Sequence, residues 1–289
     1  MTATTATTPT NAAAVLADTN QHYDLDPEIF GLFLDSSRKY SSGLYRSPSD
    51  TLAQAQVNKL HFVAQRLGLR GGEHLLDVGC GWGSLLLFMA GEYKCQTVGI
   101  SPAGRQHEYI RTRSHELGVA ERVTTVQGHF EETDFPAGGF DAVTMLGSIV
   151  HMPDLSAAFG RARALLRRGG TLYVSESCFR NTAAHTTFHQ RAGTRFVGDA
   201  IFGWGDLRPV SELVRGAEDA GFSLTSLDDL TGDYRQTIDD WLTNVRGAAV
   251  AIEQIRPGLA AQLERYLEIA NAGWGYTTKH YALTCRKAR

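Results

Sequence analysis

Apolar and polar positions along residues 51–175 alternate in a way that predicts strands and helices in turn. Short apolar runs predict buried strands at 75–78, 97–100, 123–126, 140–146 and 172–174. Between them, apolar residues recur every three or four positions, which predicts helices at 51–67, 85–93, 105–117 and 155–166. Thr51 and Gln54 have the spacing of a capping box, and Gly169 and Gly170 are expected to end the last of these helices. Strands that alternate with helices indicate a parallel sheet covered on both faces.

The same pattern organises the rest of the chain into domains. It breaks between 177 and 206, then predicts helices at 210–220, 238–255 and 259–272 and strands at 222–227 and 276–285. We therefore expect a Rossmann-like α/β fold, with a mostly parallel seven-stranded sheet between two helical layers. One domain would span 51–289, with 177–206 as an insertion that covers the substrate. Residues 15–50 would form a helical lid, and 1–14, rich in Thr and Ala, a disordered leader.

Composition narrows the classes of partner. The formal net charge is −3 and no charge block occurs, so neither nucleic acid nor an anionic membrane is the expected partner. The four cysteines form no CxxC pair, which argues against a disulfide framework and a zinc cluster. The sequence has no apolar stretch of about 20 residues, and its first residues do not have the pattern of a signal peptide, so no integral membrane contact is expected. These features favour a cytoplasmic protein with a small-molecule substrate, and a homo-oligomer stays open.

A glycine-rich loop is the strongest chemical signal. The apolar run at 75–78 contains Asp77 and leads into Gly79, Gly81 and Gly83, after which a helix begins. Glycines at this point let the backbone approach a ligand closely. No GK[ST] sequence follows to hold a phosphate chain. A nucleotide without a pyrophosphate therefore fits better than NAD or ATP, although a purely structural turn is the alternative.

This loop resembles motif I of class I S-adenosylmethionine (SAM) methyltransferases. Over about residues 20–286 the chain resembles the cyclopropane fatty-acid and mycolic-acid synthase family. The motifs that carry the similarity include Tyr40-Ser41-Ser42, Val98-Gly99-Ile100-Ser101, Gln106, Gly147, His151, Tyr234, Thr237 and Trp241. The resemblance implies SAM as cofactor, with binding residues at Tyr40, Ser41, Asp77, Gly79, Gly81, Ser101 and Gln106, and with His129 and Phe130 beside the adenine.

Two departures from the family bear on the reaction. Cyclopropane synthases methylate an alkene and then remove a proton with a bicarbonate, held partly by a cysteine, a glutamate, a histidine and a tyrosine. Here Ser42 stands at the cysteine position and Val150 at the glutamate position, whereas His151 and Tyr234 remain. We therefore expect C-methylation of an alkene carbon without ring closure as the first choice.

A methylated alkene is a carbocation, which needs shielding and a base. Glu176 follows the fifth predicted strand directly and is our candidate base, with His151 and Tyr234 as further catalytic candidates. A solvated loop glutamate or a helix cap is the alternative for Glu176. Aromatic faces stabilise cations, and the candidates for contact with substrate are Tyr23, Phe202, Phe222 and Trp274.

The irregular segment after the fifth strand adds several cations. Arg180, His185 and His189 would suit a diphosphate, so a prenyl diphosphate such as geranyl or isopentenyl diphosphate is the leading substrate. Such a substrate could bring Mg²⁺, whereas the chain itself is expected to hold no metal site. An ordinary solvated surface is the alternative for these cations. Other open functions are a cyclopropane or methyl-branching synthase on unsaturated acyl chains, an O- or N-methyltransferase, and a SAM-bound cyclase.

Overall fold

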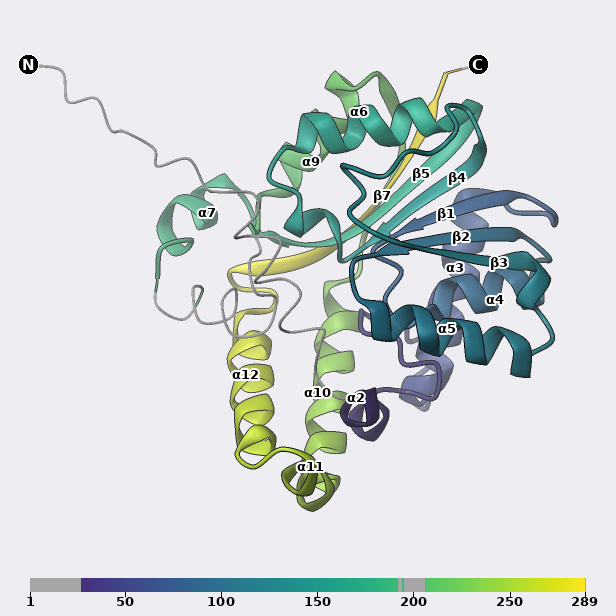
Figure 1. The fold of residues 1–289 in the computed structure, drawn as a ribbon. Helices are drawn as coiled ribbons and strands as arrows, with labels where there is room; N and C mark the ends of the chain where they lie inside the picture. Colours follow the sequence, from purple (N-terminus) through teal and green to yellow (C-terminus); the bar gives the residue numbers. More distant parts are fainter. Residues whose placement is uncertain (1–26, 192–193, 195–205, 289) are drawn as a thin grey trace, which may run out of the picture.

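The computed structural model describes residues 27–191, 194 and 206–288. A seven-stranded sheet with the order β3-β2-β1-β4-β5-β7-β6 forms its centre (Figure 1). Strands β1 to β5 run parallel to one another, and β7 runs antiparallel to its neighbours β5 and β6. The predicted fold class is confirmed. The strands are β1 (His74–Val78), β2 (Gln96–Ser101), β3 (Val123–Gln127), β4 (Phe140–Leu146), β5 (Leu166–Phe179), β6 (Phe222–Asp229) and β7 (Thr278–Lys287).

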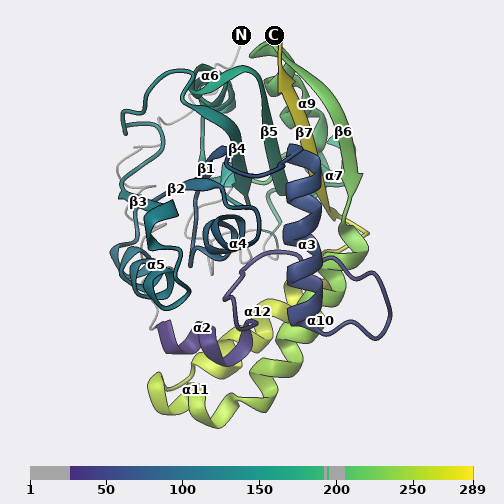
Figure 2. The same ribbon diagram turned by 90° about the vertical axis from the view of Figure 1, so that its right-hand side faces the viewer.

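Helices cover both faces of the sheet and add a further layer at one end. One face carries α3 (Leu52–Leu67), α4 (Ser84–Glu92) and α5 (Gly104–Glu116), and the other α6 (Leu155–Leu165) and α9 (Val210–Asp219). Figures 1 and 2 show the end layer below the sheet: α2 (Pro27–Phe33), α10 (Thr231–Gly247), α11 (Ala249–Ile255) and α12 (Leu259–Gly273). Shorter elements are η1 (Ala120–Arg122), η2 (Ile149–His151) and α7 (Thr182–Phe188).

The predicted start of α3 is confirmed, whereas the predicted ends of two other helices differ in the structure. The capping box of α3 is confirmed, because Gln54 N–H donates to Thr51 Oγ1 at 3.3 Å and Thr51 N–H donates to Gln54 Oε1 at 2.8 Å. Helix α6 ends at Leu165, before the two glycines, because Leu166 is extended and pairs with β4. Gly169, with φ +75°, instead lies inside β5. The single helix predicted at 238–255 is two helices that meet at Ala248.

The end layer has an aromatic core that reaches the glycine-rich loop. Phe30 of α2 lies with its ring centroid 5.4 Å from Trp82 and 5.9 Å from Tyr40. Tyr40 in turn lies 5.1 Å from Trp241 of α10. The predicted lid is therefore part of one packed layer together with the C-terminal helices, as far as the described residues of 15–50 show.

The described residues contain neither a membrane-spanning helix nor a disulfide. No helix among them is long and apolar enough to cross a membrane. The four cysteines all lie in this part of the chain, and each is buried without a disulfide. Each thiol has its pKa raised, with burial as the main cause, so these are inert packing groups at neutral pH.

Candidate functional site

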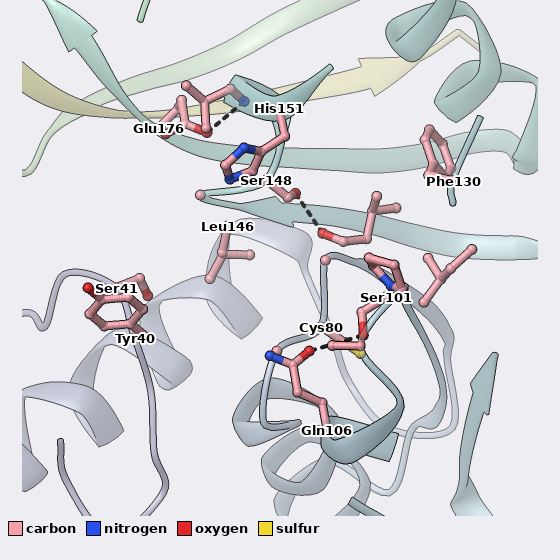
Figure 3. A pocket seen from close by; sticks show the side chains of 18 of the residues that line it. Tyr40, Ser41, Cys80, Ser101, Gln106, Phe130, Leu146, Ser148, His151 and Glu176 are labelled. Atoms are coloured by element: carbon pink, nitrogen blue, oxygen red, sulfur yellow. Dashed lines mark hydrogen bonds between the residues drawn. The ribbon is translucent and has the colours of Figure 1, made fainter. Parts of the chain in front are cut away.

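A cavity opens where the carboxyl ends of the parallel strands meet, the edge at which doubly wound sheets bind ligands. Its walls come from the glycine-rich loop, the ends of β2, β4 and β5, the segment around η2, and the chain that precedes α3. Figure 3 shows Tyr40 and Ser41 at one side, Phe130 at the other, and Glu176 with His151 across from Gln106. The predicted residues that line it are Tyr40, Ser41, Gly79, Gly81, Ser101, Gln106, His129, Phe130, His151, Glu176 and Tyr234.

The glycine-rich loop presents bare backbone to the cavity. Gly79 has φ +74°, and a Cβ there would lie 2.5 Å from the Cβ of Ser148. Ser148 is fixed in that place, since its hydroxyl donates to the Val78 carbonyl at 2.6 Å. Gly81 has φ +53° and would meet nothing within 4 Å. Only glycine suits both positions, and the open side of the loop is a cradle for a ligand.

The opposite part of the cavity has the character of a nucleoside site. The Ser101 hydroxyl donates to Gln106 Oε1 at 3.0 Å, so both polar groups are held at the end of β2 (Figure 3). The Phe130 ring is buried, with the Arg161 guanidinium 5.4 Å from its centroid, and His129 lies beside it in the lining. A flat apolar ring and paired hydroxyl and amide groups fit a base and a ribose.

Residues 38–44, which precede α3, form a strap, and residues 38–41 of this strap line one side of the cavity (Figure 3). Gln56 Nε2 donates to the Ser41 carbonyl at 2.8 Å, and Lys59 Nζ donates to the Ser41 hydroxyl at 2.8 Å. Gly43 N–H donates to Thr237 Oγ1 at 2.8 Å. These bonds fix the strap to α3 and α10. Ser42, at the family's cysteine position, is buried and donates to the Gly43 carbonyl, and it does not line the cavity.

Asp77 lies behind the glycine-rich loop and is absent from the lining. It is buried, and Thr144 Oγ1 donates to its Oδ1 at 2.7 Å. Burial raises the pKa of this carboxyl, although the nearby Lys39 ammonium opposes the shift. Its Oδ2 has no hydrogen-bond partner among the described residues. The predicted cofactor contact of Asp77 is therefore not direct in this structure, because the carboxyl lies beneath the loop and outside the cavity lining.

Glu176 is a buried carboxyl at the cavity wall, and the solvated-loop alternative is wrong. Only 5% of the residue is exposed. Oε1 accepts from Ser177 N–H at 2.8 Å and Oε2 from Val150 N–H at 3.2 Å (Figure 3). Burial raises the pKa of Glu176 to about 7, against the two backbone donors. Val150, which the resemblance places at the family's glutamate position, thus supplies a backbone N–H that orients a carboxylate from β5.

His280 is a cavity residue that the sequence analysis missed. Its Nε2 lies 2.7 Å from the Ser175 hydroxyl, and its ring centroid lies 4.7 Å from that of Tyr234. Burial, helped by the Lys59 ammonium, lowers the pKa of His280 to about 3, so the ring is neutral. Trp274 packs on Tyr234 at 4.7 Å and supports it from behind, without lining the cavity. The sequence did carry a signal for His280, since it occupies one of the inward-facing positions in the alternating pattern of the last strand.

Several predicted substrate contacts are not brought to the cavity. Arg180 lies over the Tyr276 ring, and His185 packs between Phe179 and His189. None of Arg180, His185 and His189 is in the lining, so the expected diphosphate clamp does not form in the described structure. No group of three metal-ligating side chains occurs there either.

The prediction that Phe222 contacts substrate is wrong, and two other predicted substrate contacts lie outside the described residues. Phe222 pairs with Lys287 at the amino end of the parallel strands and packs in the core with Leu213 and Ala217. It therefore lies at the far end of the sheet from the cavity and contacts no substrate there. Tyr23 and Phe202 lie outside the described residues.

Comparison with known proteins identifies the family of the chain. A family model described as mycolic acid cyclopropane synthetase matches residues 11–282. A probable fatty acid methyltransferase of Pseudomonas putida is 30% identical over 229 residues, which cover 78% of this chain and 57% of that protein. The methoxy mycolic acid synthase MmaA3 of Mycobacterium tuberculosis is 28% identical over 286 residues, 90% of this chain and 89% of that protein.

A solved structure shares the fold. Mycolic acid cyclopropane synthase CmaA1, complexed with SAH and CTAB, has a TM-score of 0.87 at 24% identity over 94% of this chain and 98% of that chain. The cradle at Gly79 and Gly81 and the polar pair Ser101–Gln106 fit the adenosyl amino acid that SAM and S-adenosylhomocysteine (SAH) share. The family model covers nearly the whole chain. The chain therefore belongs to the mycolic acid cyclopropane synthetase family, and it is a SAM-dependent methyltransferase.

Proposed function

We propose that the protein methylates an alkene carbon of an unsaturated acyl chain, with Glu176 as the base that completes the reaction. The observation that carries this proposal is the buried Glu176 carboxyl at the cavity wall, whose pKa lies at about 7. The names of the relatives favour acyl substrates over prenyl diphosphates. The absence of Arg180, His185 and His189 from the lining supports the same choice.

The cofactor would lie along the cavity from the strap to Phe130. Tyr40, Ser41 and the glycine-rich loop would hold its methionine end, and Ser101, Gln106, His129 and Phe130 its adenosine. When bound, SAM supplies an electrophilic methyl group. Because the electrophile is already reactive, the main task of the chain is to align the alkene and exclude water.

The described residues can manage the positive charge on the substrate. An alkene carbon that gains a methyl group leaves a carbocation on its neighbour, and the Tyr234 ring at the cavity wall can shield it. The Glu176 carboxylate then accepts a proton, and the electrons of the broken C–H bond form a new bond in the substrate. Loss from a chain carbon gives a methyl-branched alkene. Loss from the added methyl group closes a ring or, after a hydride shift to the cationic carbon, leaves a methylene group.

Glu176 takes over a task that the family gives to bound bicarbonate. The family's cysteine and glutamate positions hold Ser42 and Val150, and neither side chain can replace both ligands. The proposal therefore places the base on the chain itself, oriented by the Val150 and Ser177 N–H groups.

The test offers the purified protein SAM with a trideuterated methyl group. Unsaturated phospholipid vesicles and acyl carriers are compared with geranyl and isopentenyl diphosphates, and mass spectrometry follows the products and SAH. We expect label in the acyl chain: three deuteriums for a methyl branch and two for a methylene group or a ring, which NMR separates. Label confined to a prenyl product would overturn the substrate class. Product formed without SAH would indicate a cyclase and overturn methyl transfer.

The role of Glu176 has its own test. We expect Glu176→Gln to lower kcat by about 10²–10⁴-fold, because an amide cannot accept the proton. The wild-type rate should rise as the pH increases through about 7, as the carboxylate forms. The exposed Glu121→Gln serves as the control and should keep the wild-type rate. Full turnover by Glu176→Gln, or a wild-type rate that does not change with pH near 7, would contradict the role of Glu176 as the base.

A further inference from the structure

Lys39 is a buried lysine at the wall of the cavity for which the proposed reaction has no use. It belongs to the strap, where its backbone N–H donates to Asp35 Oδ1 at 2.9 Å. Only 6% of the residue is exposed, and it lines the cavity. No ion pair within 4 Å joins its ammonium to the described residues. The nitrogen is not among the fully buried atoms that lack a hydrogen-bond partner, so it is accessible from the cavity. Because burial of the side chain disfavours its charged form, an ammonium that faces a cavity without an anion beside it points to a ligand that supplies one.

The second buried lysine nearby gives an internal comparison. Lys59 of α3 donates to the Ser41 hydroxyl at 2.8 Å, which fixes the strap, and it does not line the cavity. Its structural role is therefore visible in the protein alone. Lys39 has no such bond, although both side chains are buried to a similar extent.

The two carboxylates near Lys39 do not form an ion pair with its ammonium. The Asp35 carboxylate accepts hydrogen bonds from Ser37 N–H, from the Ser37 hydroxyl and from Lys39 N–H. It therefore stabilises the local backbone turn at residues 35–39. Asp77 accepts from Thr144 and lies behind the glycine-rich loop. Both carboxylates favour the charged form of Lys39, yet burial dominates and lowers the pKa of its ammonium. The charges of the protein leave the lysine without direct contact to an anion.

The position of Lys39 indicates which part of a ligand it meets. Ser101, Gln106 and Phe130 form the nucleoside part of the cavity, while Lys39 lies on the strap, within electrostatic reach of Asp77 and Cys80 at the glycine-rich loop. An adenosyl amino acid that spans these two regions puts its amino-acid end at the strap. That end carries a carboxylate, and charge-assisted hydrogen bonds between ammonium and carboxylate are strong.

We propose that the Lys39 ammonium binds the α-carboxylate of SAM. This inference rests on SAM as cofactor and is independent of the acyl substrate and of Glu176. In the free protein burial disfavours the ammonium, and the carboxylate of the cofactor would offset that cost on binding. Lys39 is thus a cofactor-binding residue that contributes to affinity at the expense of stability in the free state.

The test compares two ligands that differ only in the carboxylate. SAH and its decarboxylated analogue, 5′-(3-aminopropylthio)adenosine, are titrated by calorimetry without any lipid substrate. The variants are Lys39→Met, which keeps the length of the side chain, and the exposed Lys94→Met as a control for net charge. We expect Lys39→Met to weaken SAH binding by roughly 10- to 100-fold, the range for a charged hydrogen bond. Its affinity for the decarboxylated analogue should match that of the wild type.

Thermal unfolding adds a readout that a structural role would move in the opposite direction. Without ligand, Lys39→Met should unfold at a higher temperature than the wild type, because it removes an unpaired buried charge. Equal losses of affinity for both ligands would overturn the proposal in favour of a structural role. Unchanged SAH affinity would overturn it too, and would suit a lysine that meets a substrate carboxylate. A wild-type protein that binds neither ligand would instead overturn SAM as cofactor.

Discussion

Glu176 is under two opposed demands, since proton transfer needs its charged form and the folded protein disfavours that form. Its pKa in the folded protein is about 7, against 4.5 for the ordinary carboxyl. The folded state therefore holds its proton more tightly than the unfolded state does. Between about pH 4.5 and 7 the unfolded state loses this proton first, so rising pH removes stability across that window. A difference of about 2.5 pKa units corresponds to about 3 kcal/mol.

This linkage predicts how Glu176→Gln changes the free energy of unfolding. Glutamine has no charge to desolvate, so the variant lacks the loss of stability between pH 4.5 and 7. Urea unfolding at pH 5 and pH 8 measures the difference between variant and wild type at each pH. We expect this difference to shift in favour of the variant by about 2–3 kcal/mol from pH 5 to pH 8. The same difference at both pH values would show that the buried carboxyl is not titrating near neutrality.

Gly79 offers a second prediction at the scale of one residue. In Gly79→Ala the added Cβ would lie 2.5 Å from Ser148, at a φ of +74°. We expect a loss of stability of about 1–3 kcal/mol and a large loss of SAH affinity, because the loop must move away from its place. Gly68→Ala is the matched control, since Gly68 has φ +70° at the end of α3 with nothing within 4 Å. It should lose stability from backbone strain alone and keep its SAH affinity, as calorimetry and thermal unfolding can measure.

At the scale of elements, the strap depends on α3 for its place over the cavity. Gln56 supplies the bond from α3 to the Ser41 carbonyl. In Gln56→Leu that buried carbonyl loses its donor, which costs about 1–3 kcal/mol. We expect faster hydrogen exchange at the Gly43 and Leu44 amides and weaker SAH binding. Gln65→Leu, an exposed change on the same helix, should leave both unchanged. Unaltered exchange in Gln56→Leu would mean that other contacts hold the strap.

The elements also separate what the sequence can predict from what it cannot. The apolar runs of the five parallel strands and the capping box at Thr51 are local signals, and the structure has all of them. The ends of β5 depend instead on distant partners, because Leu166 pairs with Phe140 and Phe179 with Thr278. Periodicity alone could not reveal those pairings, so the strand was predicted too short.

The same distinction holds for the site. The glycine-rich loop follows the end of β1, and Glu176 lies inside β5, just beyond the apolar run that predicted this strand, and both line the cavity. Lys39 and His280 were missed because their burial arises only when the strap and β7 reach the cavity from opposite ends of the chain. Phe222 was misplaced for the converse reason. Its aromatic character was visible, whereas the antiparallel direction of β7, which sets the end of the sheet at which Phe222 lies, was not.

At the scale of the molecule, the cavity lies between the sheet and the aromatic end layer, so the packing of that layer should affect cofactor affinity. Phe30 of α2 is buried against Trp82 of the glycine-rich loop and against Tyr40 of the strap. It links an N-terminal helix, packed on α10 and α11, to two walls of the cavity. This connection predicts that a packing defect in the end layer lowers the affinity for the ligand, whereas an equal defect elsewhere in the core leaves that affinity unchanged.

The pair Phe30→Leu and Phe159→Leu tests this connection. Both rings are almost fully buried, but Phe159 of α6 packs in the core on the other face of the sheet and does not line the cavity. Each substitution should lower the free energy of unfolding by about 1–2 kcal/mol, as expected for a core side chain that shrinks. We expect only Phe30→Leu to weaken SAH binding several-fold, measured by calorimetry well below the unfolding temperature. If the two variants lost affinity equally, the effect would follow from global stability, and the end layer would have no special part in holding the cofactor.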